Sequence, residues 1–334
     1  MMICAMVMAS LLSFMELNCE NLFDTCHDSM KQDYQYLPDS PRRWTGGKLF
    51  CKVRNIAQTI LMAGAQNDDN GGIPDIVALC EVENDTVMTM LTRRSPLRTF
   101  FYDYLMTSSP DARGIDVALM YDSTRFVPIC HQCWRVQMPE GESPTRDVLY
   151  VKGVTYNLDT LHVMVVHAPS RLGGKRKTDG KRMAVATRVR HAIDSIQSLN
   201  PNAHIIVAGD FNAGFNDKSL NTICGNSMTD VTPRREKRHD DINDGNETNA
   251  TITRDKRHIF GTYWYQGHWE TIDHVLLSNG LANLVERSFI MTDTVLIEYD
   301  ERQGCYKPRR SYKGYHFDPK GVSDHLPIVV RMRL

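Results

Sequence analysis

The sequence IIVAGDFNA, at residues 205–213, joins the pattern of a buried strand to polar side chains that follow it directly. An unbroken apolar run that is rich in β-branched residues is typical of a strand covered on both faces of its sheet. Asp210 and Asn212 stand where that run ends. Because a buried carboxylate without partners is costly or changes its pKa strongly, Asp210 is expected to have polar or ionic neighbours.

The same succession of an apolar run and a polar residue recurs along the chain. It is found after the segments SFMEL, DIVALC and HVMVV, within WETIDHVLLS, and before PIVV. The polar residues concerned are Asn18, Glu20, Glu81, His167, Asp210, Asn212, Asp273, Asp324 and His325. Since each would be costly to bury alone, we expect them to come together around a divalent cation.

Carboxylate and amide oxygens predominate in this set, which contains no cysteine. Such an oxygen-rich site favours a hard cation, Mg²⁺ or Mn²⁺, over a structural zinc ion. Mg²⁺ usually binds through one or two protein carboxylates and completes its shell with water or phosphate oxygens. The expected substrate is therefore a phosphate ester.

Apolar and β-branched runs at several places predict strands. The expected strands are residues 14–18, 76–80, 115–121, 148–154, 161–166, 205–208, 272–277 and 327–332. Apolar residues at helical spacing predict helices at 48–63 and 183–199. This mixture indicates a layered α/β sandwich. Because no linker divides the chain, residues 1–334 are expected to form one domain.

The composition limits the classes of partner. Lys and Arg number 39 against 40 Asp and Glu, which gives a formal net charge of −1. This balance argues against a protein that holds nucleic acid by bulk charge alone, although a local basic patch is compatible with it. The nine cysteines include one C-x-x-C pair, Cys130 and Cys133, and no second pair completes a zinc site. They are interpreted as buried or free thiols.

Three segments depart from the pattern of the rest. Residues 1–12 are apolar without Lys or Arg, which is not a convincing signal peptide, and the run is too short for a membrane span. They are interpreted as a partial leader, extra N-terminal residues or the beginning of the first strand, and the compartment stays open between cytoplasm and export. Residues 233–258 and 301–321 are expected to be long loops, the second rich in Lys, Arg and Tyr.

The ordered segments LNCENLFD, VALCEVEN, VVHAPS, VAGDFNA, TIDHVLLS and SDHLPIVV resemble the endonuclease/exonuclease/phosphatase superfamily and cover nearly the whole chain. ENLFD, RGIDVALMYD, HAPSRLGGK and GTYWYQGHWETIDHVLLS resemble a bacterial branch of it. The resemblance implies the DNase I-like fold, a four-layer α/β/β/α sandwich with two packed mixed sheets. It also implies a metal-dependent hydrolase that acts on phosphoric ester bonds.

The resemblance assigns metal binding to four residues. Glu81 corresponds to the main metal-binding glutamate of the family, and Asn18 to its first-strand asparagine. Glu20 stands where a second acidic residue lies near the metal, and Asp324 corresponds to a late metal-linked aspartate. For Asn18 the alternative is a turn-forming side chain.

The resemblance assigns catalysis to five residues. Asp210, with Asn212 beside it, corresponds to the aspartate that orients or deprotonates the attacking water. His325 corresponds to the phosphate-contacting histidine, and Asp273 to the carboxylate that orients it. His167 corresponds to a histidine that contacts the phosphate or assists the leaving group. The chemistry agrees with these roles, because an adjacent carboxylate keeps a histidine protonated. For Asp210 the alternative is a helix or turn cap.

Two arginines are candidate substrate contacts. Arg171 lies in SRLGGK, a segment that either cradles phosphate with its backbone N–H groups or forms a flexible turn. Arg113 either reaches the substrate or pairs with Asp116.

Together these features predict a phosphoesterase that hydrolyses a phosphodiester by in-line attack of an activated water, with DNA as one candidate substrate. The alternative substrate is a small-molecule or lipid-headgroup phosphate, because shared fold does not decide the substrate. A third reading is a non-catalytic binding module, which is disfavoured because every expected position of the site is filled. No protein partner is implied.

Overall fold

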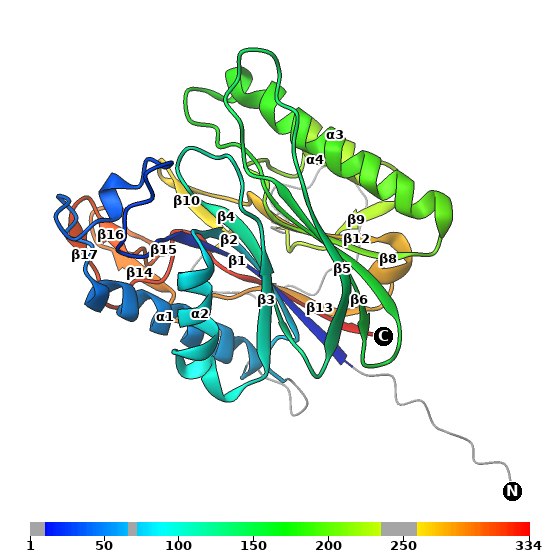
Figure 1. The fold of residues 1–334 in the computed structure, drawn as a ribbon, viewed down its shortest axis with the longest axis horizontal. Coiled ribbons are helices and arrows are strands. Elements are labelled where there is room, and N and C mark those ends of the chain that lie inside the picture. Colours follow the sequence, from blue (N-terminus) through cyan, green and yellow to red (C-terminus); the bar gives the residue numbers. More distant parts are fainter. Residues whose placement is uncertain (1–10, 66–71, 235–258) are drawn as a thin grey trace, which may run out of the picture.

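The computed structural model describes residues 11–65, 72–234 and 259–334. Two six-stranded mixed sheets form its centre (Figure 1). The first contains, in spatial order, β13 (Val285–Ile290), β18 (Ile328–Arg333), β1 (Leu11–Leu22), β2 (Ile76–Val82), β4 (Asp116–Asp122) and β3 (Tyr102–Met106). The second contains β5 (Phe126–Trp134), β6 (Val148–Thr155), β7 (Thr160–His167), β8 (His204–Asp210), β12 (Asp273–Ser278) and β9 (Met228–Asp230).

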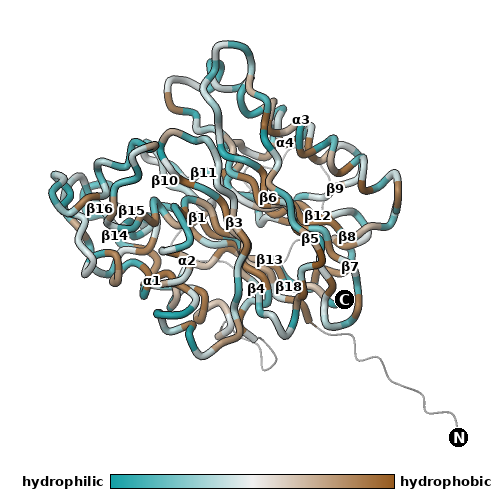
Figure 2. The backbone as a smooth tube through the Cα atoms, viewed as in Figure 1, coloured by the Kyte–Doolittle hydropathy of each residue, from teal (hydrophilic) through white to brown (hydrophobic). Residues whose placement is uncertain are grey.

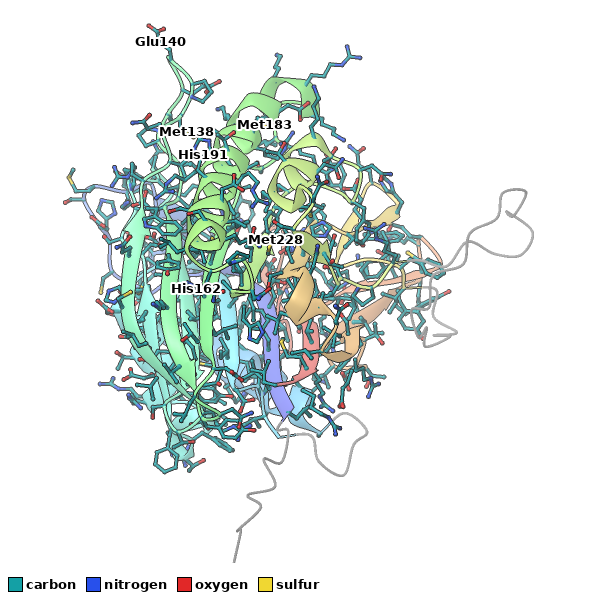
Figure 3. The ribbon with its side chains drawn as sticks, turned by 90° about the vertical axis from the view of Figure 1, so that its right-hand side faces the viewer. Met138, Glu140, His162, Met183, His191 and Met228 are labelled. Atoms are coloured by element: carbon teal, nitrogen blue, oxygen red, sulfur yellow. The ribbon has the colours of Figure 1, made fainter. Side chains whose placement is uncertain are left out.

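Helices cover the outer face of each sheet. On the first sheet lie α1 (Gly46–Gly64) and α2 (Asp85–Arg93), and on the second lie α3 (Lys175–Leu199) and α4 (Lys218–Cys224). Figure 3 shows α3 across the outer side of the second sheet, with Met183 near Met138. The one-turn helix α5 (Asn279–Ala282) follows β12. The molecule is thus the four-layer α/β/β/α sandwich that the sequence predicts.

The core between the two sheets consists of alternate residues of each strand. In β8, Ile206 and Ala208 face the first sheet, whereas Ile205 and Val207 face the helices. Figure 2 shows the apolar residues concentrated on these central strands. The period of two is expected of strands, and it explains why runs such as IIVA are apolar throughout: both faces are covered.

The eight predicted strands and two predicted helices are all present. Sequence periodicity did not indicate β3, β5, β9, β13, α2 or α4. Residues 301–321 were expected to form a loop, but β14 (Ile297–Asp300) pairs with β15 (Cys305–Pro308), and β16 (Tyr312–Lys313) with β17 (His316–Phe317). Cross-strand aromatic packing supports the first hairpin, where the rings of Tyr299 and Tyr306 lie 5.1 Å apart. A further hairpin joins β10 (Tyr263–Tyr265) and β11 (His268–Glu270).

Two predicted features fall largely outside the described residues: the N-terminal segment up to residue 10 and the loop from 235 to 258. Within the described ranges, no helix combines the length and apolar character needed to cross a bilayer.

Candidate active site

The polar residues at the strand ends continue the inward-facing rows of the core. In β8 the row of Ile206 and Ala208 leads to Asp210, and in β7 the row of Val163 and Val165 leads to His167. The rows that end in this way lead to Asn18, His167, Asp210 and Asp273. The candidate site therefore lies at one end of the core between the two sheets.

Asp210 connects the two sheets. It is the cross-strand neighbour of His167 on β7 and of Asp273 on β12. The side-chain amide of Asn18, on the first sheet, donates a hydrogen bond to Asp210 Oδ2 at 3.2 Å. Residues separated by almost 200 positions in the chain thus meet at one carboxylate, as the sequence predicts.

Asp210 is also bonded to the turn that follows it. The backbone N–H of Asn212 donates to Asp210 Oδ1 at 2.8 Å, and the Asn212 side chain donates to the carbonyl of Ala168 at 3.1 Å. Burial, followed by the charge of Asp273, raises the pKa of Asp210 to about 7. A carboxyl with that pKa can accept a proton near neutral pH.

Asp273 and His325 form a buried dyad. Nδ1 of His325 lies 2.8 Å from Asp273 Oδ2, and the two side chains are 7% and 0% exposed. Burial by itself lowers the pKa of His325, but the charge and hydrogen bond of Asp273 raise it well above its ordinary value. The Tyr263 ring lies 4.8 Å from the imidazole. His325 is thus held as an imidazolium, with its Nδ1 proton donated to Asp273.

His167 is kept neutral by its surroundings. Burial, together with the charges of Arg146 and Arg113, lowers its pKa well below the ordinary value. Its Nε2 lies 3.5 Å from Asp210 Oδ2 and 3.9 Å from Glu81 Oε1. The site therefore contains one protonated histidine, His325, and one neutral histidine, His167.

A β-bulge turns Glu81 into the site. In β2, Cys80 faces the second sheet, so the next residue of a regular strand would face the helices. The register of β2 against both neighbours shifts between Cys80 and Val82, and Glu81 has a φ of 60°. Its Oε2 accepts the backbone N–H of Asn21 at 2.8 Å. Bulges that redirect a side chain are typical beside active sites.

Glu20 and Asp324 are grouped around Arg310. Nε of Arg310 donates to Glu20 Oε1 at 3.1 Å, and its Nη2 lies 3.1 Å from Asp324 Oδ2. Glu20 Oε2 accepts the backbone N–H of Ser311 at 2.7 Å. Burial and then the charge of Asp324 raise the pKa of Glu20. Both carboxylates already bind Arg310, so a cation would compete with Arg310 for them.

Arg113 reaches the site. Its Nη2 donates to Asn21 Oδ1 at 2.5 Å and lies 3.5 Å from Glu81 Oε1. Asp116 accepts instead from Thr107 Oγ1 and the backbone N–H of Ser109. The predicted alternative of an Arg113–Asp116 pair is therefore wrong.

Arg171 forms an ion pair with Glu270 of β11, whose cross-strand neighbour Tyr263 packs against the His325 ring. The glycines that follow it, Gly173 and Gly174, have φ values of 89° and 110°. They form the turn into α3, where a residue with a side chain would be strained.

Some residues of the site were not assigned from sequence. Arg146 donates to Asp111 at 2.9 Å and to the carbonyl of Ala168, beside His167, at 3.0 Å. Glu16 is fully buried in the row that leads to Asn18, and neither of its carboxylate oxygens has a hydrogen-bond partner among the described residues. An acid within the apolar run SFMEL was the available signal for Glu16, whereas nothing in the local sequence indicated Arg146.

Two groups of atoms could hold a cation. Ligand atoms of Asp210, Asp273 and His325 lie within 4.8 Å of one another. The short His325–Asp273 hydrogen bond already accounts for two of these residues, so a cation at that position would have to break the dyad.

Glu81 and Asn18 offer the better fit. Among the described residues, Glu81 Oε1 has its contacts to Arg113 and His167 at 3.5 and 3.9 Å, so no short bond occupies it. Oδ1 of Asn18 accepts one hydrogen bond, from the Glu20 backbone, and keeps a second lone pair. A carboxylate oxygen and an amide oxygen are ligands that suit a hard divalent cation.

Comparison with known proteins agrees with this geometry. Protein angel of Drosophila melanogaster is 24% identical over 210 residues, which cover 62% of this chain and 55% of that protein. The chain thus spans about half the length of this curated relative.

Solved structures share the fold. An endonuclease/exonuclease/phosphatase family protein from Bacteroides thetaiotaomicron superimposes with a TM-score of 0.57 and 15% identity, over 97% of this chain and 95% of that chain. A mannosyl-6-phosphatase of the same organism gives 0.57 and 17%, over 96% and 98%. Residues 13–334 match the family described as Endonuclease/Exonuclease/phosphatase family. The chain therefore belongs to the endonuclease/exonuclease/phosphatase family, whose members are hydrolases of phosphoester bonds.

Proposed function

We propose that this chain hydrolyses a phosphodiester by in-line attack of water, with a divalent cation, Mg²⁺ or Mn²⁺, held by Glu81 and Asn18. The observation that carries the proposal is the meeting of residues from both sheets at Asp210, between His167 and the Asp273–His325 dyad. Glu20 and Asp324 would join the cation if Arg310 moved aside to contact the phosphate.

Asp210 is the general base of the proposed reaction. It accepts one proton from water as the water oxygen bonds to phosphorus, and the bond from phosphorus to the leaving oxygen breaks. Its pKa of about 7 supports this role, because a base is most effective when its pKa is near the working pH. Positioned general-base catalysis contributes about 10²–10⁴-fold to the rate. Asn212 holds the carboxylate in place.

The histidines bind the phosphate in different ways. The His325 imidazolium, fixed by Asp273, presents its Nε2 proton to a non-bridging oxygen, where negative charge develops. Neutral His167 donates a hydrogen bond to the phosphate or to the leaving oxygen. A bound divalent cation supplies further neutralisation of the phosphate charge. Arg113, whose Nη2 lies 3.5 Å from Glu81 Oε1, would assist in this neutralisation.

Two observations bear on the class of the physiological substrate. The net charge of −1 and the fold shared with a mannosyl-6-phosphatase support a small phosphorylated molecule as a second candidate beside DNA. A nuclease would have to use local positive charge, such as the Lys- and Arg-rich segment 301–321.

The test is hydrolysis of bis(4-nitrophenyl) phosphate by metal-stripped protein to which Mg²⁺ or Mn²⁺ is returned. We expect turnover with either ion and none in EDTA. Supercoiled plasmid and mannose 6-phosphate, assayed in parallel, separate the substrate classes. If bis(4-nitrophenyl) phosphate, the plasmid and mannose 6-phosphate all stay intact with both ions, the proposal is wrong. An intact plasmid with a hydrolysed sugar phosphate would exclude the nuclease.

A further inference from the structure

A cavity adjoins the candidate active site. It has a volume of about 350 Å³, at the small end of ligand pockets, which span roughly 300–1,000 Å³. We call it the basic pocket, and its walls include Tyr36, Arg42, Trp44, Lys52, Ser311 and Tyr312. None of these residues takes part in the reaction proposed above.

The basic pocket borders the reaction centre at Glu20 and Asn21, which also line it. The backbone N–H of Asn21 donates to Glu81 Oε2 at 2.8 Å. Burial raises the pKa of Tyr36 to about 12, and its hydroxyl is near enough to feel the charges of Arg42, Glu81 and Arg113. A substrate held at Glu81 can therefore extend into the pocket.

Arg42 is held in place in the pocket wall. Its guanidinium carbon lies 5.1 Å from the ring centres of both Tyr36 and Tyr312, so the group is held between two aromatic rings. Its Nη1 donates to the Tyr36 hydroxyl at 3.0 Å, and its carbonyl accepts from Lys48 Nζ at 2.7 Å. A guanidinium fixed in this way loses little side-chain entropy when it binds an anion.

The pocket carries more positive than negative charge. Four cations line it, Arg42, Lys52, Arg310 and Lys313, against one carboxylate, Glu20. Lys313 lies 2.6 Å from Glu298, whereas in the part of the chain that the structure describes no carboxylate lies within 4.0 Å of Arg42. Lys52 is 1% exposed, and its Nζ donates to Ser311 Oγ at 2.6 Å and lies 3.7 Å from Glu20. Glu20 is already bonded to Arg310.

The neighbouring cavity differs in the pairing of its lining cations with carboxylates. It lies on the other side of Arg310, measures about 580 Å³ and includes Lys307 in its wall. Lys307 lies 2.6 Å from Asp300 and 3.8 Å from Glu298, so its charge is neutralised. Among the described residues, Arg42 is a cation with no carboxylate within 4.0 Å, and this distinguishes the basic pocket from the adjoining cavity.

We propose that the basic pocket binds a second phosphate group of the substrate, with Arg42 as its main ligand. The planar guanidinium suits the bidentate recognition of phosphate. The inference rests on the proposed function, since it places the first phosphate at Glu81. The second phosphate comes either from a nucleic-acid backbone or from a small polyphosphorylated molecule.

The test compares matched substrates with and without the second phosphate. One pair is thymidine 5′-(4-nitrophenyl phosphate) with and without a 3′-phosphate, and the other is inositol 1,4-bisphosphate and inositol 1-phosphate. We expect kcat/KM to be at least tenfold higher for the doubly phosphorylated member of one pair. An advantage in the first pair identifies a nucleotide backbone, and one in the second pair a small molecule.

Variants of Arg42 show whether the pocket is responsible. Arg42→Gln should reduce the advantage to less than threefold, and Arg42→Lys, which keeps the charge, should retain part of it. The control is Arg43→Gln, an exposed arginine that does not line the pocket; it should keep the full advantage. If neither pair shows an advantage, or if Arg42→Gln keeps it, the inference is wrong while the proposed hydrolysis stands.

Failure of the proposed hydrolysis leaves the inference testable. If nothing is turned over, thymidine 3′,5′-bisphosphate and thymidine 5′-monophosphate are stable ligands, as are the two inositol phosphates. Calorimetry in Mg²⁺ should then give at least tenfold tighter binding of the bisphosphate in one pair, lost in Arg42→Gln. Equal affinities in both pairs would contradict the inference.

Discussion

At the scale of single residues, the site depends on environments that move the pKa values of similar groups apart. Asp273 raises the pKa of His325, whereas burial and the charges of two arginines lower the pKa of His167. Such separation assigns acid and base roles to identical side chains.

His162 gives a prediction for stability. It lies on β7, on the face turned towards α3 (Figure 3), with Nδ1 2.8 Å from the Tyr150 hydroxyl. Burial and the charge of Lys152 lower its pKa to about 4. Between pH about 6.5 and 4 the unfolded chain therefore binds a proton that the folded chain does not, so stability falls as the pH decreases.

We expect His162→Gln to remove that loss. Its size is roughly 1 kcal/mol, because the ring is partly exposed and its charge is partly screened by solvent. Urea unfolding at pH 7 and pH 4.5 measures it, with His191→Gln on α3 as the matched control. An equal loss of stability in His162→Gln and the wild type would show that the ring does not titrate as described.

At the scale of elements, strand β8 depends on the absence of a side chain at Gly209. Its φ is 139°, and an added Cβ would lie 1.9 Å from the carbonyl oxygen of Val166 on β7. The close approach of β7 and β8 brings His167 opposite Asp210. The glycine in GDFN is thus required by the geometry that forms the site.

Gly209→Ala should lower the free energy of unfolding by on the order of 3 kcal/mol or more, because strand separation must increase. Gly214→Ala is the control, since its nearest contact would be at 3.9 Å. Urea denaturation compares the two. If Gly209→Ala unfolds at the same urea concentration as Gly214→Ala, the close packing of β7 on β8 is not as described.

Sequence patterns predicted some elements and not others. Strands such as β8 were predicted, because a strand that is buried on both faces has apolar residues at every position, and this run is visible in the sequence. The edge strand β5 was not, since most of its residues are exposed and its pairing depends on β6. The bulge at Glu81 depends on how β2 pairs with both β1 and β4, and no local sequence pattern predicts that pairing.

At the scale of the whole molecule, the site exists because two sheets pack face to face. Asn18 and Glu81 come from the first sheet, and Asp210, His167 and Asp273 from the second. The order of motifs predicted this convergence through the family resemblance, and residue types alone predicted a shared cation. The roles of Arg310 and Arg146 depend on contacts across 290 and 22 positions, which lie beyond any sequence pattern. That residues 1–334 form one domain stays a prediction.

The central claim is that residues of the two sheets act as one site. Its most direct test is a double-mutant cycle on bis(4-nitrophenyl) phosphate, with Glu81→Gln on the first sheet and Asp210→Asn on the second. Each change should lower kcat/KM by about 10²–10⁴-fold. Since groups that act as a unit are not additive, the double variant should be about as slow as the slower single one. Losses that multiply, or a single variant with the wild-type rate, would contradict the account.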